Sequence, residues 1–79
     1  MPRPRPRPRV VVYTAPGCHL CRPAVDVVRS VCGDEFAIVD ISTEPRLERR
    51  YRLRIPVVEI DGTARFTYEV DAAELRALV

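Results

Sequence analysis

An apolar run and the cysteine pair just after it constrain the fold of this chain more than any other segments. Every residue of Val10–Thr14 is apolar or β-branched, which is typical of a strand buried on both faces of a sheet. Ala15-Pro16-Gly17 is a turn signal. The pair Cys18-His19-Leu20-Cys21 follows, and a helix fits from about residue 19 to residue 31, before Gly33 as a natural stop. The cysteines are therefore predicted to lie where a strand leads into a helix.

This position favours redox chemistry. The N-terminus of a helix carries a partial positive charge and free N–H groups, which stabilise a thiolate. A free cysteine is only about 3 % thiolate at neutral pH, and motifs of this kind lower its pKa of ~8.5 to ~3.5–7.5. The CxxC spacing lets Cys21 attack a mixed disulfide formed by Cys18.

A structural zinc site is the alternative for the same cysteines. Such a site needs four ligands, and His19 and Cys32 are the only other soft ligands in the sequence. We therefore predict no metal. Cys32 falls on the apolar stripe of the helix and is expected to be a small buried hydrophobe, with a regulatory disulfide as its alternative.

Length and cysteine content indicate a single small domain. The chain has 79 residues and three cysteines, and an odd number of cysteines does not form the closed disulfide framework of a small secreted protein. No apolar stretch approaches the ~18 residues of a membrane span. We expect a monomeric protein in the cytoplasm.

The first nine residues differ from the rest. Proline and arginine alternate in them, and four of the thirteen arginines lie there. We predict a disordered leader at residues 1–9 and a domain at residues 10–79. The alternative is an electrostatic arm on a binding module, for nucleic acid or an acidic partner. The remaining residues hold nine arginines and eleven acids, so positive charge is expected only in the leader.

The rest of the chain predicts an α/β domain. Strands are expected at residues 36–41, 57–61 and 63–68, with a hairpin turn at Asp61-Gly62. Ser42 or Thr43 is expected to cap a helix that runs to about Arg52, and Asp71 to cap a last helix. The order β-α-β-α-β-β-α predicts a four-stranded mixed sheet with helices on both faces.

Residues 10–79 resemble a small glutaredoxin-like member of the thioredoxin superfamily. The stretch from Tyr13 to Cys21, the sequence Arg54-Ile55-Pro56-Val57-Val58 and the following Asp61-Gly62 carry the resemblance. It implies a thioredoxin-like fold of the glutaredoxin type. It also implies an exposed Cys18 as nucleophile and a less accessible Cys21 that resolves the mixed disulfide.

The resemblance further implies a cis peptide bond between Ile55 and Pro56. The backbone of Ile55 would then pair with an extended peptide or with glutathione. The family needs no bound cofactor beyond the redox-active disulfide. Its implied partners are a protein or small-molecule disulfide and a reductant, either glutathione or a thioredoxin-reductase-type flavoprotein.

Three further residues are candidates at the site. Tyr13 is expected either at the rim of the site or in the core. His19 either favours a thiolate when it is charged or is simply solvated. Arg22 either adds positive potential near the cysteines or is solvated. The chain has Ala15 where typical glutaredoxins carry lysine, and residues 68–70 where they carry a glycine pair. The sequence therefore favours dithiol chemistry without specifying glutathione.

Overall fold

The computed structural model describes residues 8–79. The elements are β1 (Val10–Thr14), α1 (Cys21–Cys32), β2 (Ala37–Asp40), a 3-10 turn (Ile41–Thr43), α2 (Pro45–Tyr51), β3 (Val57–Ile60), β4 (Thr63–Thr67) and α3 (Ala72–Leu78). Of the leader expected at residues 1–9, only Pro8 and Arg9 lie within the described residues.

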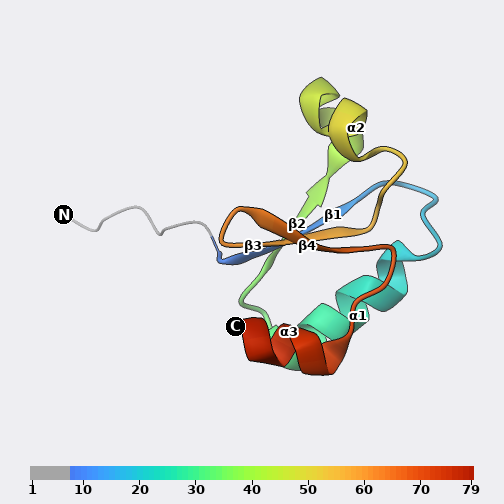
Figure 1. The fold of residues 1–79 in the computed structure, drawn as a ribbon. Helices are drawn as coiled ribbons and strands as arrows, with labels where there is room; N and C mark the ends of the chain where they lie inside the picture. Colours follow the sequence, from blue (N-terminus) through green and yellow to red (C-terminus); the bar gives the residue numbers. More distant parts are fainter. Residues whose placement is uncertain (1–7) are drawn as a thin grey trace.

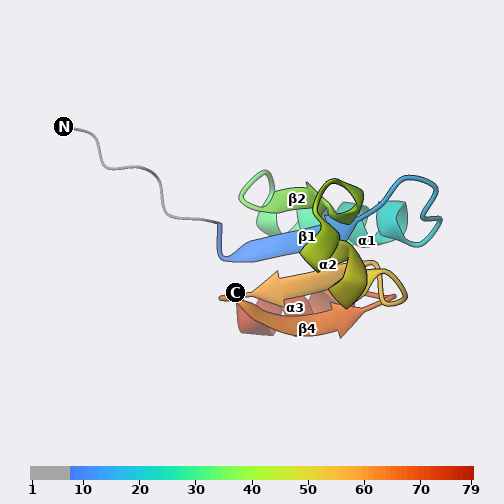
Figure 2. The ribbon, with the colours of Figure 1, turned by 90° about the horizontal axis from the view of Figure 1, so that it is seen from above.

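The four strands form one mixed sheet in the order β2-β1-β3-β4 (Figures 1 and 2). β1 and β2 are parallel, whereas β3 is antiparallel to both β1 and β4. Val12 lies at the centre, paired with Ile38 on one side and Val58 on the other. The predicted element order and mixed sheet are confirmed.

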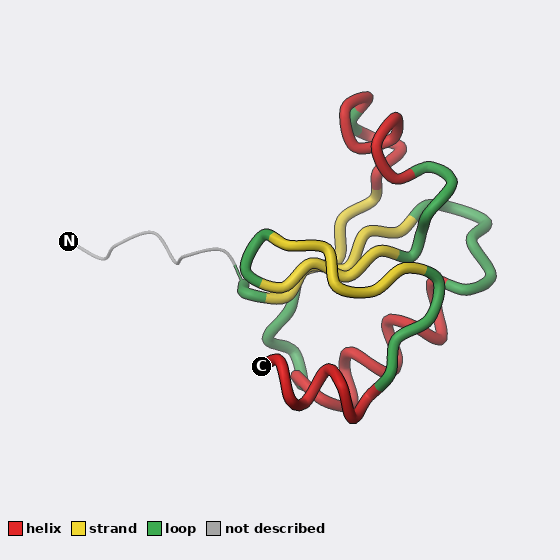
Figure 3. The backbone as a smooth tube through the Cα atoms, viewed as in Figure 1, coloured by secondary structure: helices red, strands yellow, loops and turns green. Residues whose placement is uncertain are grey.

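Helices cover both faces of the sheet, α1 and α3 on one and α2 on the other (Figures 1 and 3). Alternate residues of a strand point to opposite faces, so β1 and β3 contribute to two cores. The first core joins Val12 and Val58 to Val28 of α1 and Leu75 of α3. The second core, below α2, contains Tyr13, Ile41, Tyr51 and Val57. Burial on both faces of the sheet explains why β1 is apolar or β-branched at every position.

The last three strands are each one or two residues shorter than predicted, at 37–40, 57–60 and 63–67, and two helices begin later than predicted. α1 begins at Cys21 instead of His19, because residues 18–20 form turns that precede it. Asp40 caps the 3-10 turn by accepting a hydrogen bond from the Ser42 N–H at 2.8 Å. Ser42 therefore belongs to this turn, and α2 begins later, at Pro45, whose missing N–H is tolerated at a helix start.

The ends of the domain are fastened by side-chain contacts. Arg9 donates from Nε and Nη2 to the two carboxylate oxygens of Asp61, at 3.0 and 2.9 Å. Asp71 caps α3 as predicted and accepts a hydrogen bond from the Glu74 N–H at 3.0 Å. In the described part of the chain, no helix has the length and apolar character needed to cross a membrane.

Candidate active site

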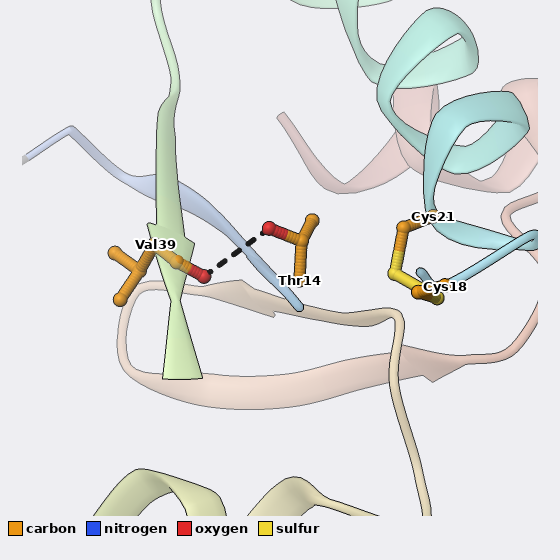
Figure 4. The surroundings of a disulfide bond; sticks show 4 residues. All are labelled: Thr14, Cys18, Cys21 and Val39. Atoms are coloured by element: carbon orange, nitrogen blue, oxygen red, sulfur yellow. Dashed lines mark hydrogen bonds between the residues drawn. A yellow bond between two sulfur atoms is a disulfide. The ribbon is translucent and has the colours of Figure 1, made fainter. Parts of the chain in front are cut away.

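Cys18 and Cys21 form a disulfide just beyond the carboxyl end of β1 (Figure 4). Their Cα atoms are 5.4 Å apart, a normal separation for a disulfide. Cys18 is partly exposed, whereas Cys21 is buried at 5 % exposure. Solvent and substrates therefore reach the two sulfur atoms unequally, with Cys18 the more accessible.

The turn before α1 fixes this asymmetry. Gly17 has a φ of 78°, which a glycine adopts without a steric penalty. The Cys18 N–H bonds to the Ala15 carbonyl at 3.3 Å, and the Cys21 N–H bonds to the Cys18 carbonyl at 3.4 Å. Cys18 thus lies in the loop, and Cys21 is the first residue of α1.

The start of α1 is electrostatically suited to a thiolate. Within α1, which is described throughout, the first turn carries no acidic residue and no side chain caps the helix. The partial positive charge of the helix end is therefore left uncompensated near the sulfur atoms. Arg22, the second residue of α1, is exposed, as is His19 between the cysteines. Both sequence-predicted polar residues thus lie beside the disulfide along the chain.

Pro56 lies at the same edge of the sheet as the end of β1. Val57 pairs with Tyr13 in the antiparallel register, so Pro56, one residue earlier, is level with the segment leading to Cys18. The Ile55–Pro56 bond is cis, as the resemblance implied. Pro56 is among the fully buried side chains, and Ile55 is half-buried against the second core. The topology therefore brings the cysteine turn and the proline loop to the same end of the strands.

Tyr68 joins the end of β4 to this proline loop. Its N–H donates to the Pro56 carbonyl at 2.8 Å, and its hydroxyl donates to the Leu53 carbonyl at 2.6 Å. Tyr68 also has a φ of 69°, a conformation that is uncommon for a residue with a side chain. The two hydrogen bonds hold it there. No pattern in the sequence indicates this role, because it depends on contacts between two loops that are distant in the chain.

An apolar recess of about 230 Å³ lies beside the CxxC turn, lined by Leu20 but by neither cysteine. Leu20, within the CxxC turn, and Tyr68 border it, and both are 47 % exposed. The other apolar lining residues are Pro23, Ala24 and Val27 of α1 and Val70, and Glu69 is the one charged lining residue among those described. The recess can receive an apolar group beside the CxxC turn. Sequence analysis did not single out Leu20, although an apolar residue inside an exposed CxxC turn was a usable signal.

Tyr13, the remaining candidate, lies in the core below α2 and is 7 % exposed. Its hydroxyl donates to Glu59 Oε1 at 3.1 Å, and the Tyr51 hydroxyl donates to Glu59 Oε2 at 2.5 Å. Burial, followed by this bond to Glu59, raises the pKa of Tyr51 to about 12. The structure thus supports the core interpretation of Tyr13. An acid inside the apolar strand Val57–Ile60 was the one sequence sign of this cluster.

Cys32 lies at the other end of α1 from the disulfide. It is half-buried and packs against the first core. Burial, and to a lesser extent the charge of Glu35, raises the pKa of the Cys32 thiol, which disfavours its reactive thiolate. Within residues 8–79, no three His, Cys, Asp or Glu side chains are grouped so as to hold a metal ion.

Comparisons with known proteins agree with this geometry. The family model described as Glutaredoxin-like domain (DUF836) matches residues 9–79. The X-ray structure of target protein XcR50 from X. campestris is 32 % identical, with a TM-score of 0.73, over 86 % of this chain and 91 % of that one. Protein Ne2328 from Nitrosomonas europaea is 26 % identical, with a TM-score of 0.66, over 98 % and 96 %.

A more distant structure shares the fold. A mutant thioredoxin from Halobacterium salinarum NRC-1 is 22 % identical, with a TM-score of 0.59, over 87 % of this chain and 68 % of that one. The search of curated proteins gives no match. The matched family covers the sheet, all three helices and the cysteine turn, so this chain belongs to the glutaredoxin-like domain family and has a thioredoxin-like fold.

Proposed function

We propose that this protein is a thiol–disulfide oxidoreductase that reduces disulfides of proteins or small molecules with the Cys18–Cys21 pair. The observation that carries the proposal is the unequal exposure of the two cysteines at an uncapped helix start. An accessible sulfur beside a buried one suits a nucleophile followed by a resolving thiol. The family membership supports the same chemistry.

The reaction transfers two electrons in two exchanges. The Cys18 thiolate attacks one sulfur of the substrate disulfide, forms a mixed disulfide and releases the other sulfur as a thiolate, which takes up a proton. Cys21, as a thiolate, then attacks the Cys18 sulfur. The second substrate sulfur leaves as a thiolate and is protonated in turn. The substrate ends as a dithiol, and the protein ends with the Cys18–Cys21 disulfide.

The surroundings favour a substrate with an apolar group beside its disulfide. Leu20, which lies between the two cysteines in the chain, and Tyr68 offer apolar surface at the CxxC turn, and the cis Pro56 segment offers backbone to an extended chain. The oxidised protein is reset by a reductant that supplies two electrons, either glutathione or a thioredoxin-reductase-type flavoprotein. We place this reaction in the cytoplasm, in line with the three cysteines of the chain, and assign it to a monomer.

The decisive experiment follows the reduction of a peptide disulfide by the prereduced protein. Cys18→Ser is expected to abolish reduction, Cys21→Ser to accumulate a mixed disulfide on Cys18, and Cys32→Ser to behave as the wild type. Full activity of Cys18→Ser would refute the proposal. Separate redox titrations against glutathione and against NADPH with the flavoprotein identify the reductant. The reduction potential of the Cys18–Cys21 disulfide is expected at about −270 mV if the protein behaves like a thioredoxin, and at about −200 to −230 mV if it behaves like a glutaredoxin.

A further inference from the structure

A groove of about 440 Å³ lies on the α2 side of the sheet, the face opposite α1 and α3. Its apolar floor includes Val11, Ala37, Val39 and Leu47, and its rim carries two arginines, Arg46 and Arg50, and one acid, Glu44. We call it the α2 groove. The mechanism above uses none of these residues.

The groove exists because α2 is too short to cover the sheet. Seven residues of helix are about 10 Å long, whereas four strands spaced by about 4.8 Å span about 14 Å. Figure 2 shows α2 lying across the sheet near the end of β1, with the first part of β1 uncovered on that side. Val11 and Val39 are consequently only half-buried. This face keeps apolar side chains that the fold itself leaves partly open to solvent.

Positive charge is concentrated beside the groove. Residues 44–54 contain five arginines and two glutamates, whereas the other residues of 8–79 contain five arginines and nine acids. Sequence analysis placed positive charge only in the leader, yet the fold gathers these arginines on α2 and the turn after it, where all five are exposed. Among the described residues, the ion pairs are Arg9–Asp61 and Arg29–Asp34, so neither involves α2.

The positions of the two rim arginines indicate which kind of ligand the α2 groove can bind. Arg46 and Arg50 are four residues apart, so they lie on one face of α2 and border the same groove. The groove also adjoins β2, which is an edge strand of the sheet and so has one side on which a further strand can pair. An extended chain beside β2 would place alternate side chains over the apolar floor. Acidic residues of such a chain would meet the arginines.

We propose that the α2 groove binds an acidic, extended polypeptide segment of a partner protein. Its apolar side chains contact Val11, Ala37 and Val39, and its carboxylates pair with the rim arginines. Nucleic acid matches the positive charge of the rim but does not match the apolar floor of the groove. Binding of single strands relies on exposed aromatic rings, and Tyr13 and Tyr51, the tyrosines on this side, are 7 % and 3 % exposed.

The test measures binding of a fluorescein-labelled peptide of alternating glutamate and valine to the full chain by anisotropy. Binding is expected at low salt and is expected to weaken as salt screens the charges. Arg46→Glu with Arg50→Glu is expected to weaken it by about tenfold, as loss and reversal of two rim ion pairs predicts. The matched control exchanges Arg65 and Arg76, which are exposed on β4 and α3, for glutamate. The control is expected to bind as the wild type.

A second pair of variants tests whether peptide binding depends on the groove itself or only on the net charge of the protein. Ala37→Glu places an acid on the groove floor and is expected to abolish binding, whereas Ile38→Glu places it on the opposite face of the same strand. Equal loss in both variants, or equal binding of a peptide with glutamine for glutamate, would overturn the proposal. A single-stranded oligonucleotide that binds more tightly than the peptide would also overturn it. So would a dimer that Ala37→Glu dissociates, because a second copy would then fill the groove.

Two further measurements complete the design. Deletion of residues 2–7 is expected to leave the effect of Ala37→Glu intact, because the residues assigned to binding, Val11, Ala37, Val39, Arg46 and Arg50, lie outside that segment. Disulfide reduction by Ala37→Glu is expected to equal that of the wild type. Failure of peptide binding therefore leaves the oxidoreductase proposal untouched, and failure of disulfide reduction leaves the groove proposal untouched.

Discussion

The N–H of Tyr68 donates a 2.8 Å hydrogen bond to the carbonyl of Pro56, twelve residues earlier in the chain. The bond ties the loop after β4 to the loop before β3. A second bond, from the Tyr68 hydroxyl to the Leu53 carbonyl, fastens the same loop further back. The proline loop of the candidate site is therefore positioned by one residue, through its backbone N–H and its hydroxyl.

Tyr68→Phe is expected to loosen this loop while leaving the fold intact. The backbone bond to Pro56 remains, and loss of the solvent-exposed hydroxyl bond is worth about 0.5 kcal/mol of the free energy of unfolding. Urea unfolding measures that loss. Amide exchange of residues 53–55 is expected to quicken more than exchange in β1. Unchanged exchange at these residues would show that the hydroxyl bond does not restrain the loop.

Leu20→Gln is expected to change which disulfides react well. Under the proposed function, kcat/KM for a peptide disulfide flanked by leucine is expected to fall about fivefold, the equivalent of roughly 1 kcal/mol of lost apolar contact. The reaction with a small polar disulfide is expected to be unchanged. Val79→Gln, at an apolar position of similar exposure away from the recess, is the control. An equal loss on both substrates would mean that Leu20 acts on the sulfur chemistry and not on recognition.

Tyr51→Phe is expected to alter the alkaline stability of the protein. The folded state holds the pKa of Tyr51 at about 12, above the ordinary value of 10.0. The stabilising contribution is thus fully present below pH 10 and is lost as pH rises toward 12. The wild type is expected to lose stability over this range more steeply than Tyr51→Phe. Urea midpoints at several pH values measure the slopes, and parallel slopes would contradict the assignment.

Arg9→Ala is expected to flatten the acid limb of the stability curve. The hydrogen bond and charge of Arg9 hold the pKa of Asp61 below its ordinary value of 3.8. A lowered carboxyl pKa contributes stability above the unfolded value and loses it as pH falls through the folded value. Thermal unfolding followed from neutral pH to below about pH 3 compares the variant with the wild type. Asp61→Asn should give the same flattened curve, and both effects should shrink in high salt.

The sequence predicted the parts of this structure that depend on local pattern. The valines of Val10–Thr14 required burial on two sides, and Asp71 had the features of a helix cap; both predictions agree with the structure. The start of α1 was predicted two residues too early. Helical spacing continues into residues 19 and 20, whereas the structure forms a separate turn there.

Long-range contacts account for the features that the sequence did not predict. Glu59 receives bonds from Tyr13 and Tyr51 because strand register and the position of α2 bring three distant residues together. The arginines of residues 46–54 lie close together in the sequence, but their position beside a half-covered apolar face of the sheet appears only in the fold. The contact between Tyr68 and the proline loop likewise joins segments that no short motif links.

The contacts of Arg9 also determine where the protein can be attached to something else. Besides Asp61, Arg9 Nη2 reaches the carbonyl of Leu78 at 3.4 Å, so the start of β1 lies beside the end of α3. β1 runs from this corner toward the disulfide, which lies beyond its opposite end. A fusion partner, an electrode or a bead joined through either end of the domain would therefore leave the cysteine edge facing the solution.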